Sequence, residues 1–275
     1  MSAPGVAKTA KLYIQGAFVR SESGRVYQTG DGVNVPRASR KDLREAVRAA
    51  REAQPSWAAR TAYNRGQVLY RTAEMMEGRR AEFVAELGGG RAAGREVDSC
   101  LESLVFFAGA ADKLAQLGGS VNGVAGPYFT FTMPEPMGVI AVIGQPEHDL
   151  GGLVRQLAAA VCGGNAVVAL VAEATPLPGL LLGEVLATGD MPAGVLALLS
   201  GMRKELLPWV GSHRDIDAVD AGGCDAGEWR TLALAAADSV KRVLPPVGRQ
   251  ARSPLNPRLA LQTMEMKTVW HPVGV

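Results

Sequence analysis

The sequence predicts an α/β protein whose core is a parallel β-sheet covered by helices on both faces. Between residues 139 and 199, apolar β-branched segments alternate with helical segments, and this order is typical of a parallel sheet. One segment, 166–171, carries no charged residue, as expected of a strand buried on both faces. The length of 275 residues is sufficient for one such domain with a sizeable appendage.

The N-terminal part predicts a short hairpin followed by helices. Residues 11–30 place apolar side chains near Gly and Ser turns, which is typical of paired edge strands. Ser39 and Asp42 have the spacing of a capping box, so a helix is expected over 43–53. Two further helical patterns, each ending in consecutive glycines, cover 63–87 and 97–117.

The periodicity becomes alternating near residue 128. Polar and apolar residues alternate over 128–132, and after two turn prolines an apolar strand is expected over 139–143. Helices and strands then follow in this order: helix 150–161, strand 166–171, helix 176–188, strand 195–199, helix 203–210, strand 216–219 and helix 228–243.

A linker and a terminal strand follow the last of these helices. Four prolines between 245 and 257 mark the linker, and side chains alternate over 264–270 as they do in a strand. Because a single strand is not stable in water, this one must pair with another strand.

The sequence indicates neither a nucleic-acid partner nor a membrane span. Lys and Arg number 29 against 27 Asp and Glu, and the two signs interleave at helical spacing, so solvated helix faces are expected and nucleic acid is not. The uncharged apolar segment 156–172 is interrupted by Gly163-Gly164-Asn165 and predicts no membrane span. Since the first residues also lack a signal-peptide pattern, a cytoplasmic protein is expected.

Cysteine and histidine are too scattered to predict a metal site. Cys100, Cys162 and Cys224 form no C-x-x-C pair, and the three histidines lie far apart. Reduced thiols are expected, with neither a disulfide framework nor a metal site.

Two short segments are candidate sites, each with a purely structural alternative. Gly222 and Gly223 lie in a turn before a helix and could present N–H groups to a phosphate, although Asp225 would place a negative charge there. A plain strand-to-helix turn explains the same residues. His148 could act as an acid or base, whereas Asp149 is well placed to cap the following helix.

The crevice beyond strand 166–171 is the usual ligand position in a doubly wound sheet. From the sequence, Glu173 is the only ionisable residue expected in this crevice.

Several phrases in this chain are specific to one family when they occur in order. They are KLYIQGAFVRSESGR, PEPMGVIAVIGQP, LAAAVCGGNAVVAL, TPLPGLLLGEVL, MPAGVLALLSG and the tail MKTVWHPVG. Over nearly its whole length the chain resembles the aldehyde dehydrogenase superfamily. The resemblance implies the Rossmann-like parallel sheet of that family's cofactor domain, a small oligomerisation hairpin and a C-terminal strand that joins the oligomerisation sheet of a neighbouring subunit.

On this resemblance the chain divides into four parts. They are the N-terminal hairpin and helices of the cofactor-like domain, 8–125; the oligomerisation hairpin region, 126–137; the Rossmann-like core, 138–245; and the linker with the C-terminal oligomerisation strand, 246–275.

The resemblance also identifies functional residues of the family that are replaced here. Leu170 stands where the family has a lysine that holds the cofactor's ribose hydroxyls, whereas Glu173 matches the acidic residue that accompanies this lysine. Residues 146–148 lack the asparagine that stabilises the oxyanion, and of the turn at the pyrophosphate only Gly223 keeps its type. Residues 244–249 lack the general-base glutamate.

A whole domain of the family, the one that carries the nucleophilic cysteine, is missing between these residues and the tail. Cys224 aligns with the pyrophosphate turn and cannot replace that cysteine. The chain resembles most closely the non-catalytic second half found in the sixteenth aldehyde dehydrogenase family, which lacks the catalytic domain.

The resemblance therefore implies a catalytically inactive subunit that associates with a complete aldehyde dehydrogenase subunit, with itself, or with both. Pairing is expected through strands near 128–136 and 264–270. No catalytic residue is expected apart from the outside candidate His148, and no cofactor is expected, so Glu173, Gly222 and Gly223 would be vestigial cofactor contacts.

Two alternatives stay open. One is an NAD- or NADP-dependent aldehyde oxidoreductase-like protein with residual cofactor binding or activity. The other is a self-associating protein that binds a different ligand in the vacated crevice.

Overall fold

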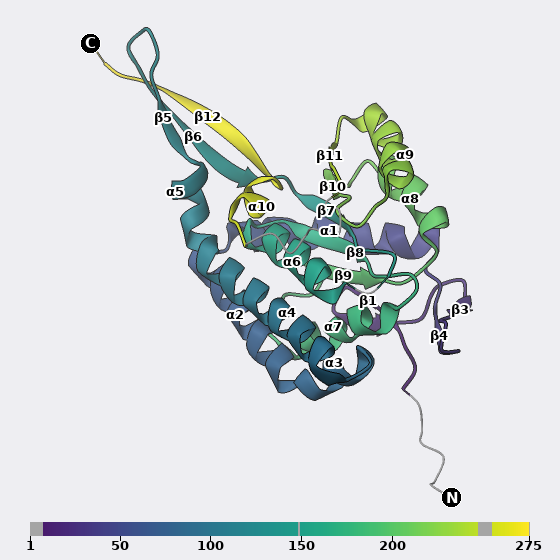
Figure 1. Cartoon of the computed structure of the whole chain (residues 1–275). Coiled ribbons are helices and arrows are strands. Elements are labelled where there is room, and N and C mark those ends of the chain that lie inside the picture. Colours follow the sequence, from purple (N-terminus) through teal and green to yellow (C-terminus); the bar gives the residue numbers. More distant parts are fainter. Residues whose placement is uncertain (1–7, 148, 247–254, 275) are drawn as a thin grey trace, which may run out of the picture.

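A computed structural model describes residues 8–147, 149–246 and 255–274, and it contains a three-layer α/β/α core from which a smaller sheet projects (Figure 1). The central sheet has seven strands in the order β11-β10-β7-β8-β9-β1-β2. The predicted α/β fold with a parallel sheet is confirmed. Five strands run parallel, namely β7 (Val139–Ile143), β8 (Ala166–Leu170), β9 (Leu196–Leu199), β10 (Ala218–Asp220) and β11 (Arg242–Leu244), and two are antiparallel, β1 (Leu12–Ile14) and β2 (Ala17–Val19).

Helices cover both faces of the central sheet and create two apolar cores. All residues of β7 and β8 are buried, which explains why these strands carry no charge. One face carries α2 (Ala62–Gly78), α3 (Arg80–Glu86), α4 (Gly90–Ala110), α6 (Leu150–Cys162) and α7 (Pro176–Thr188). The other carries α1 (Arg40–Ala59), α8 (Arg203–Ser212) and α9 (Ala226–Ala236).

Two helix starts follow the predicted capping chemistry. The Ser39 hydroxyl accepts the N–H of Asp42, and the Asp42 carboxylate accepts the N–H of Ser39, which completes the capping box of α1. Asp149 caps α6, because its carboxylate accepts the N–H of Gly152 at 3.0 Å.

Three helix predictions need correction. The pattern over 63–87 is two helices, α2 and α3, that meet at Arg79. The pattern over 97–117 starts earlier, at Gly90, and the 3-10 turn η1 (Ala111–Lys113) separates α4 from α5 (Leu114–Gly118). The helix predicted over 228–243 is wrong at its end: α9 and the 3-10 turn η2 (Ala237–Ser239) finish before Val240, whose φ of 53° redirects the chain into β11.

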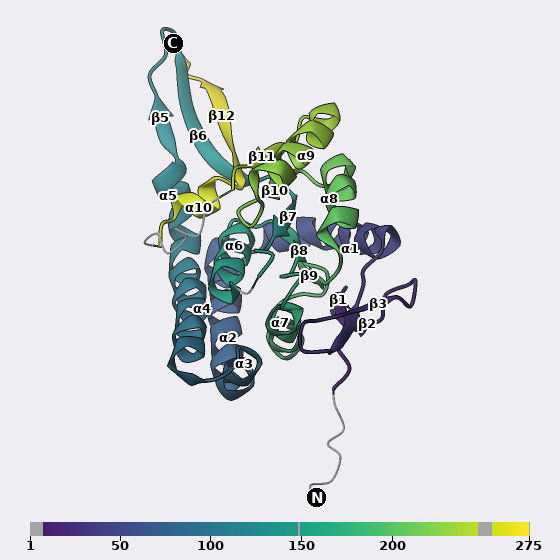
Figure 2. The same cartoon turned by 45° about the vertical axis from the view of Figure 1, so that its right-hand side comes forward.

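The projecting sheet contains β5 (Ser120–Asn122), β6 (Tyr128–Pro136) and β12 (Met264–Pro272) in the order β12-β6-β5. The tail strand β12 pairs antiparallel with β6 over all nine residues. Both views show this sheet extending away from the core, at the end opposite a small hairpin of β3 (Val26–Gln28) and β4 (Asn34–Pro36) (Figures 1 and 2). A short helix, α10 (Arg258–Leu261), precedes β12.

No helix in the described ranges combines the length and the apolar character that crossing a bilayer requires.

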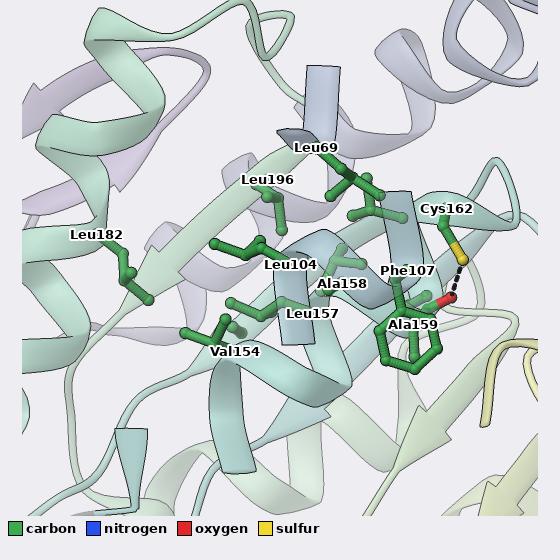
Figure 3. Packing of buried hydrophobic residues seen from close by; sticks show 14 of the residues in the cluster. Leu69, Leu104, Phe107, Val154, Leu157, Ala158, Ala159, Cys162, Leu182 and Leu196 are labelled. Atoms are coloured by element: carbon green, nitrogen blue, oxygen red, sulfur yellow. Dashed lines mark hydrogen bonds between the residues drawn. The ribbon is translucent and has the colours of Figure 1, made fainter. Parts of the chain in front are cut away.

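The larger core lies between β8, β9 and the helices α2, α4, α6 and α7. Figure 3 shows Leu104, Val154 and Leu157 pointing toward one another there, with Cys162 donating its thiol to the carbonyl of Ala159 at 3.2 Å. An apolar cavity of about 30 Å³ lies beside these side chains. Because almost no polar atoms line it, a water molecule has few partners there.

The Leu104→Ala variant should lose about 2–5 kcal/mol of unfolding free energy, because it enlarges a cavity that the neighbours have not closed. Urea unfolding followed by circular dichroism measures this loss. The matched control is Leu117→Ala, since Leu117 is exposed and the change should stay within about 0.5 kcal/mol. Equal losses for the two variants would contradict the packing described here.

Candidate functional site

The sheet order creates a topological switch point between β7 and β10. From β7, the chain adds β8 and β9 on one side of the sheet and β10 and β11 on the other. In open α/β sheets, ligands bind outside the carboxyl ends of the strands at such a point. The candidate site is therefore the region around Gly144, which follows β7, and the 221–225 turn, which follows β10.

A cleft of about 1000 Å³ opens next to the switch point, beyond β8 and β9. The loop of the β3–β4 hairpin forms one wall, and the segments that lead into α7 and α8 form much of the rest. The expectation that Glu173 is the only ionisable residue of the crevice is wrong, because elements distant in the sequence bring further charges to it. Carboxylates outnumber cations along its walls: Asp31, Glu86, Glu147, Glu173 and Glu228 face Arg203 and Lys204.

Arg203, the first residue of α8, fills the switch point with a buried guanidinium group. Its Nη1 donates to the carbonyl of Gly144 and its Nη2 to the carbonyl of Gly223, at 2.9 Å for the latter. Its Nε and Nη2 also bind the Glu228 carboxylate, at 2.8 and 2.6 Å. Burial disfavours this charge, but the hydrogen bond and charge of Glu228 raise the pKa of Arg203 above its ordinary value.

Glu173, predicted as a vestigial cofactor contact, lines the cleft but is engaged inside the chain. Its Oε2 accepts the backbone N–H of Arg203 at 2.7 Å, so Glu173 caps α8 from the loop after β8. The hydroxyl of Tyr27 donates to the Glu173 carbonyl at 3.0 Å and ties the β3–β4 hairpin to the same loop. Burial and the nearby Glu173 charge raise the pKa of Tyr27.

Gly222 and Gly223, the other predicted contacts, have no N–H directed at a ligand. The N–H of Gly222 donates to the Asp220 carboxylate, and that of Gly223 donates to the Ile143 carbonyl, both at 3.0 Å. A Cβ added at Gly223 would lie 2.2 Å from the carbonyl carbon of Gly144. The turn therefore lies directly on the end of β7, and only glycine fits there.

The start of α9 is occupied by the chain's own carboxylates. Asp225 accepts the N–H of Glu228 at 2.8 Å, and Glu228 accepts the N–H of Asp225 at 3.1 Å. These contacts are those of a strand-to-helix turn closed by a capping box.

The residues at the switch point do not fit a nicotinamide dinucleotide. Its diphosphate requires N–H donors or cations, but the donors of this turn bind protein acceptors and its one buried cation binds Glu228. Leu170 ends β8 as a buried aliphatic residue and provides no charge for a ribose.

The other candidates have no catalytic arrangement in the described residues. His148 lies outside them, its neighbour Asp149 caps α6, and Glu147 lines the cleft. Within residues 8–147, 149–246 and 255–274, no cluster of His, Cys, Asp and Glu could hold a metal ion.

Sequence reasoning missed Arg203, the residue on which this site is organised. One signal was present, because a cation at the first position of a helix opposes the helix dipole and calls for another role.

A sequence model of the aldehyde dehydrogenase family matches residues 27–251. Among solved structures, an aldehyde dehydrogenase from Bacillus cereus, in a complex with NAD⁺, is 25% identical with a TM-score of 0.77, and the match covers 86% of this chain and 50% of that one. PnpE in complex with nicotinamide adenine dinucleotide is 25% identical with a TM-score of 0.76, and the match covers 86% of this chain and 50% of that one. A betaine aldehyde dehydrogenase variant from Staphylococcus aureus is 21% identical with a TM-score of 0.76, and the match covers 86% of this chain and 49% of that one. This chain thus spans about half the length of the structures it matches.

The three thiols should be unreactive in the folded protein. Burial raises the pKa of Cys162 and of Cys224 to about 12 and also raises that of Cys100. At pH 8 only about one in ten thousand of the Cys162 and Cys224 thiols is then ionised, and the thiolate is the reactive form. A disulfide reagent such as DTNB should label no cysteine within minutes at pH 8 and all three in guanidinium chloride. Rapid labelling of Cys224 in the folded protein would contradict this arrangement.

Proposed function

The chain belongs to the aldehyde dehydrogenase family, and from this premise we propose that it is a catalytically inactive subunit that associates with a complete aldehyde dehydrogenase as a structural or regulatory partner. The finer assignment that we propose is to the non-catalytic second half of the sixteenth aldehyde dehydrogenase family. We also propose a cytoplasmic location, because unpaired cysteines such as its three are typical of a reducing compartment.

The observation that carries this proposal is the projecting sheet. In the described residues β12 pairs only with β6, so the other edge of a nine-residue strand is open. Exposed strand edges of this length are templates for pairing with another chain.

Both faces of the projecting sheet also expose apolar side chains. The rings of Tyr128 and Trp270 are 5.7 Å apart on one face, and those of Phe129 and Phe131 are 5.8 Å apart on the other. Trp270 is 58% exposed. Apolar surface of this kind is typical of a protein–protein contact.

The short connection into this sheet supports catalytic inactivity. Fewer than 20 residues separate the end of β11 at Leu244 from the start of β12 at Met264. A folding unit needs at least about 50 residues, so the segment has no space for the domain that carries the family's nucleophilic cysteine. The buried thiols described above do not replace it.

One alternative function has a specific observation in its favour. The cleft of about 1000 Å³ is large enough for a small-molecule ligand, and several matched structures were solved with NAD. An NAD- or NADP-dependent oxidoreductase-like protein with residual cofactor binding would use this cleft. Dissociation constants above about 1 mM for both nucleotides, which correspond to less than about 4 kcal/mol of binding free energy, would count against it.

Native mass spectrometry of the tagged protein, purified from its own host, tests the main proposal. A complex containing a chain large enough to be a complete aldehyde dehydrogenase is expected. Recovery only as a monomer or homo-oligomer would overturn the partner assignment and, for a homo-oligomer, indicate pairing between copies of this chain.

Lysines at the β12 edge should abolish the association. The double variant Val269→Lys/Trp270→Lys places charges on both faces of the edge strand, where partner strands would have to bury them. Co-purification with the partner should fall by on the order of a hundredfold, as expected when a few anchor residues dominate an interface.

Tyr63→Lys is the matched control for this experiment. Tyr63 is an equally exposed aromatic residue, 66% exposed, but lies on α2 rather than in the projecting sheet. The control should co-purify like the wild type. Substitutions are preferable to deleting residues 258–275, because that deletion also removes Thr263 from the core. Retention of the complex by the double variant would show that docking occurs elsewhere.

A further inference from the structure

We propose that Glu228 is an internal anion that occupies the anion position at the switch point, held there by Arg203, and thereby closes the crevice to nicotinamide dinucleotides. This inference deepens the proposed function, on which it rests for its consequence. A subunit whose cofactor position is filled by its own side chains has a shape, and a docking surface, that do not respond to cofactor concentration.

The start of α9 is a position that attracts an anion. The 11-residue helix directs its N-terminus toward the switch point, where free N–H groups and the helix dipole attract an anion. Glu228 supplies this anion from within the first turn, and Asp225 supplies a second carboxylate. An incoming phosphate would have to displace a charge that is covalently part of the helix.

The ion pair between Arg203 and Glu228 has the geometry of a guanidinium bound to an anionic ligand. Two nitrogen atoms of Arg203 bind the two carboxylate oxygens of Glu228 at 2.8 and 2.6 Å, which is the bidentate arrangement that guanidinium groups also form with phosphate. The remaining donors of Arg203 reach the carbonyls of Gly144 and Gly223, on the two sides of the switch point. The guanidinium therefore has its anionic partner and two backbone partners already in place.

The crevice also has too little space, and too much negative charge, for a diphosphate. The backbone of Gly223 lies against that of Gly144, so no ligand fits between them. Along the adjacent cleft, five carboxylates face two cations, and one of these cations is Arg203. A diphosphate would add negative charge to a surface that already has an excess of it, at a cost that grows as the site is desolvated.

The test is a gain of binding on removal of the internal anion. Glu228→Ala leaves the Arg203 guanidinium without its bidentate acceptor and frees the N–H of Asp225. Inorganic pyrophosphate, the probe, should bind this variant on the order of tenfold more tightly than the wild type, because charge-assisted hydrogen bonds then become available. Isothermal titration calorimetry at millimolar probe concentration, with ³¹P NMR line widths, measures the difference on the isolated chain.

Glu205→Ala is the matched control. Glu205, on α8, is also a carboxylate bound by an arginine, Arg37, but it does not line the cleft. This variant should bind pyrophosphate no better than the wild type. The double variant Arg203→Met/Glu228→Gln should also show no gain, since it removes the guanidinium together with the carboxylate.

Three results would overturn the proposal. They are equal pyrophosphate binding by Glu228→Ala and the wild type, a gain that persists in the double variant, and binding of NAD⁺ to the wild type with a dissociation constant below about 1 mM. The last needs no variant and stands even where a substitution prevents folding. Because these measurements involve no partner, their failure is separate from failure of the subunit proposal.

Discussion

One buried amide, that of Asn165, connects the central sheet to the segment that ends in the projecting sheet. Its Oδ1 accepts the N–H of Gly138 at 3.0 Å, just before β7, and its Nδ2 donates to the carbonyls of Ala160 and Thr263, also at 3.0 Å. Loss of this amide would leave two buried backbone groups, the N–H of Gly138 and the carbonyl of Thr263, without their partner, at about 1–3 kcal/mol each. Asn165 therefore fixes where the chain enters β12, and the side chain of Met264 packs on Gly163 directly beside it.

The position of β12 is a consequence of this anchor. With Thr263 held on the core, the next nine residues pair with the strand β6 that leads into β7, and Arg242 of β11 donates to the carbonyl of Met264 at 3.0 Å. The pairing is in register from Met264 opposite Pro136 to Pro272 opposite Tyr128, and the hydroxyls of Thr132 and Thr268 meet at 2.8 Å. Both strands leave the core side by side, which explains why the sheet projects instead of packing on the body.

The sequence was sufficient for the elements whose signal is local. The strands 139–143 and 166–170 are uncharged because both faces are covered, and the capping residues Ser39 and Asp149 mark helix starts through their own hydrogen bonds. The strand β11 was missed because the Ala-rich pattern of α9 continues past Ala236 without a glycine or proline. The chain turns at Val240 in a left-handed conformation that a β-branched residue rarely adopts, so local propensity gave no warning.

The candidate site shows the same division between local and long-range information. Sequence position identified Glu173, Gly222 and Gly223 as neighbours of the crevice, and Glu173 does line the cleft. Their hydrogen bonds depend on partners distant in the chain, Arg203 for Glu173 and Ile143 for Gly223, and no local pattern specifies these.

The switch point and the projecting sheet differ in whether their polar groups have partners within the chain. At the switch point Arg203, Glu228 and the N–H groups of the turn already have partners within the chain, so a ligand gains little by replacing them. At the edge of β12 a row of backbone groups and the apolar side chains beside it face solvent, so association there removes apolar surface from water and adds strand hydrogen bonds without breaking any within the fold.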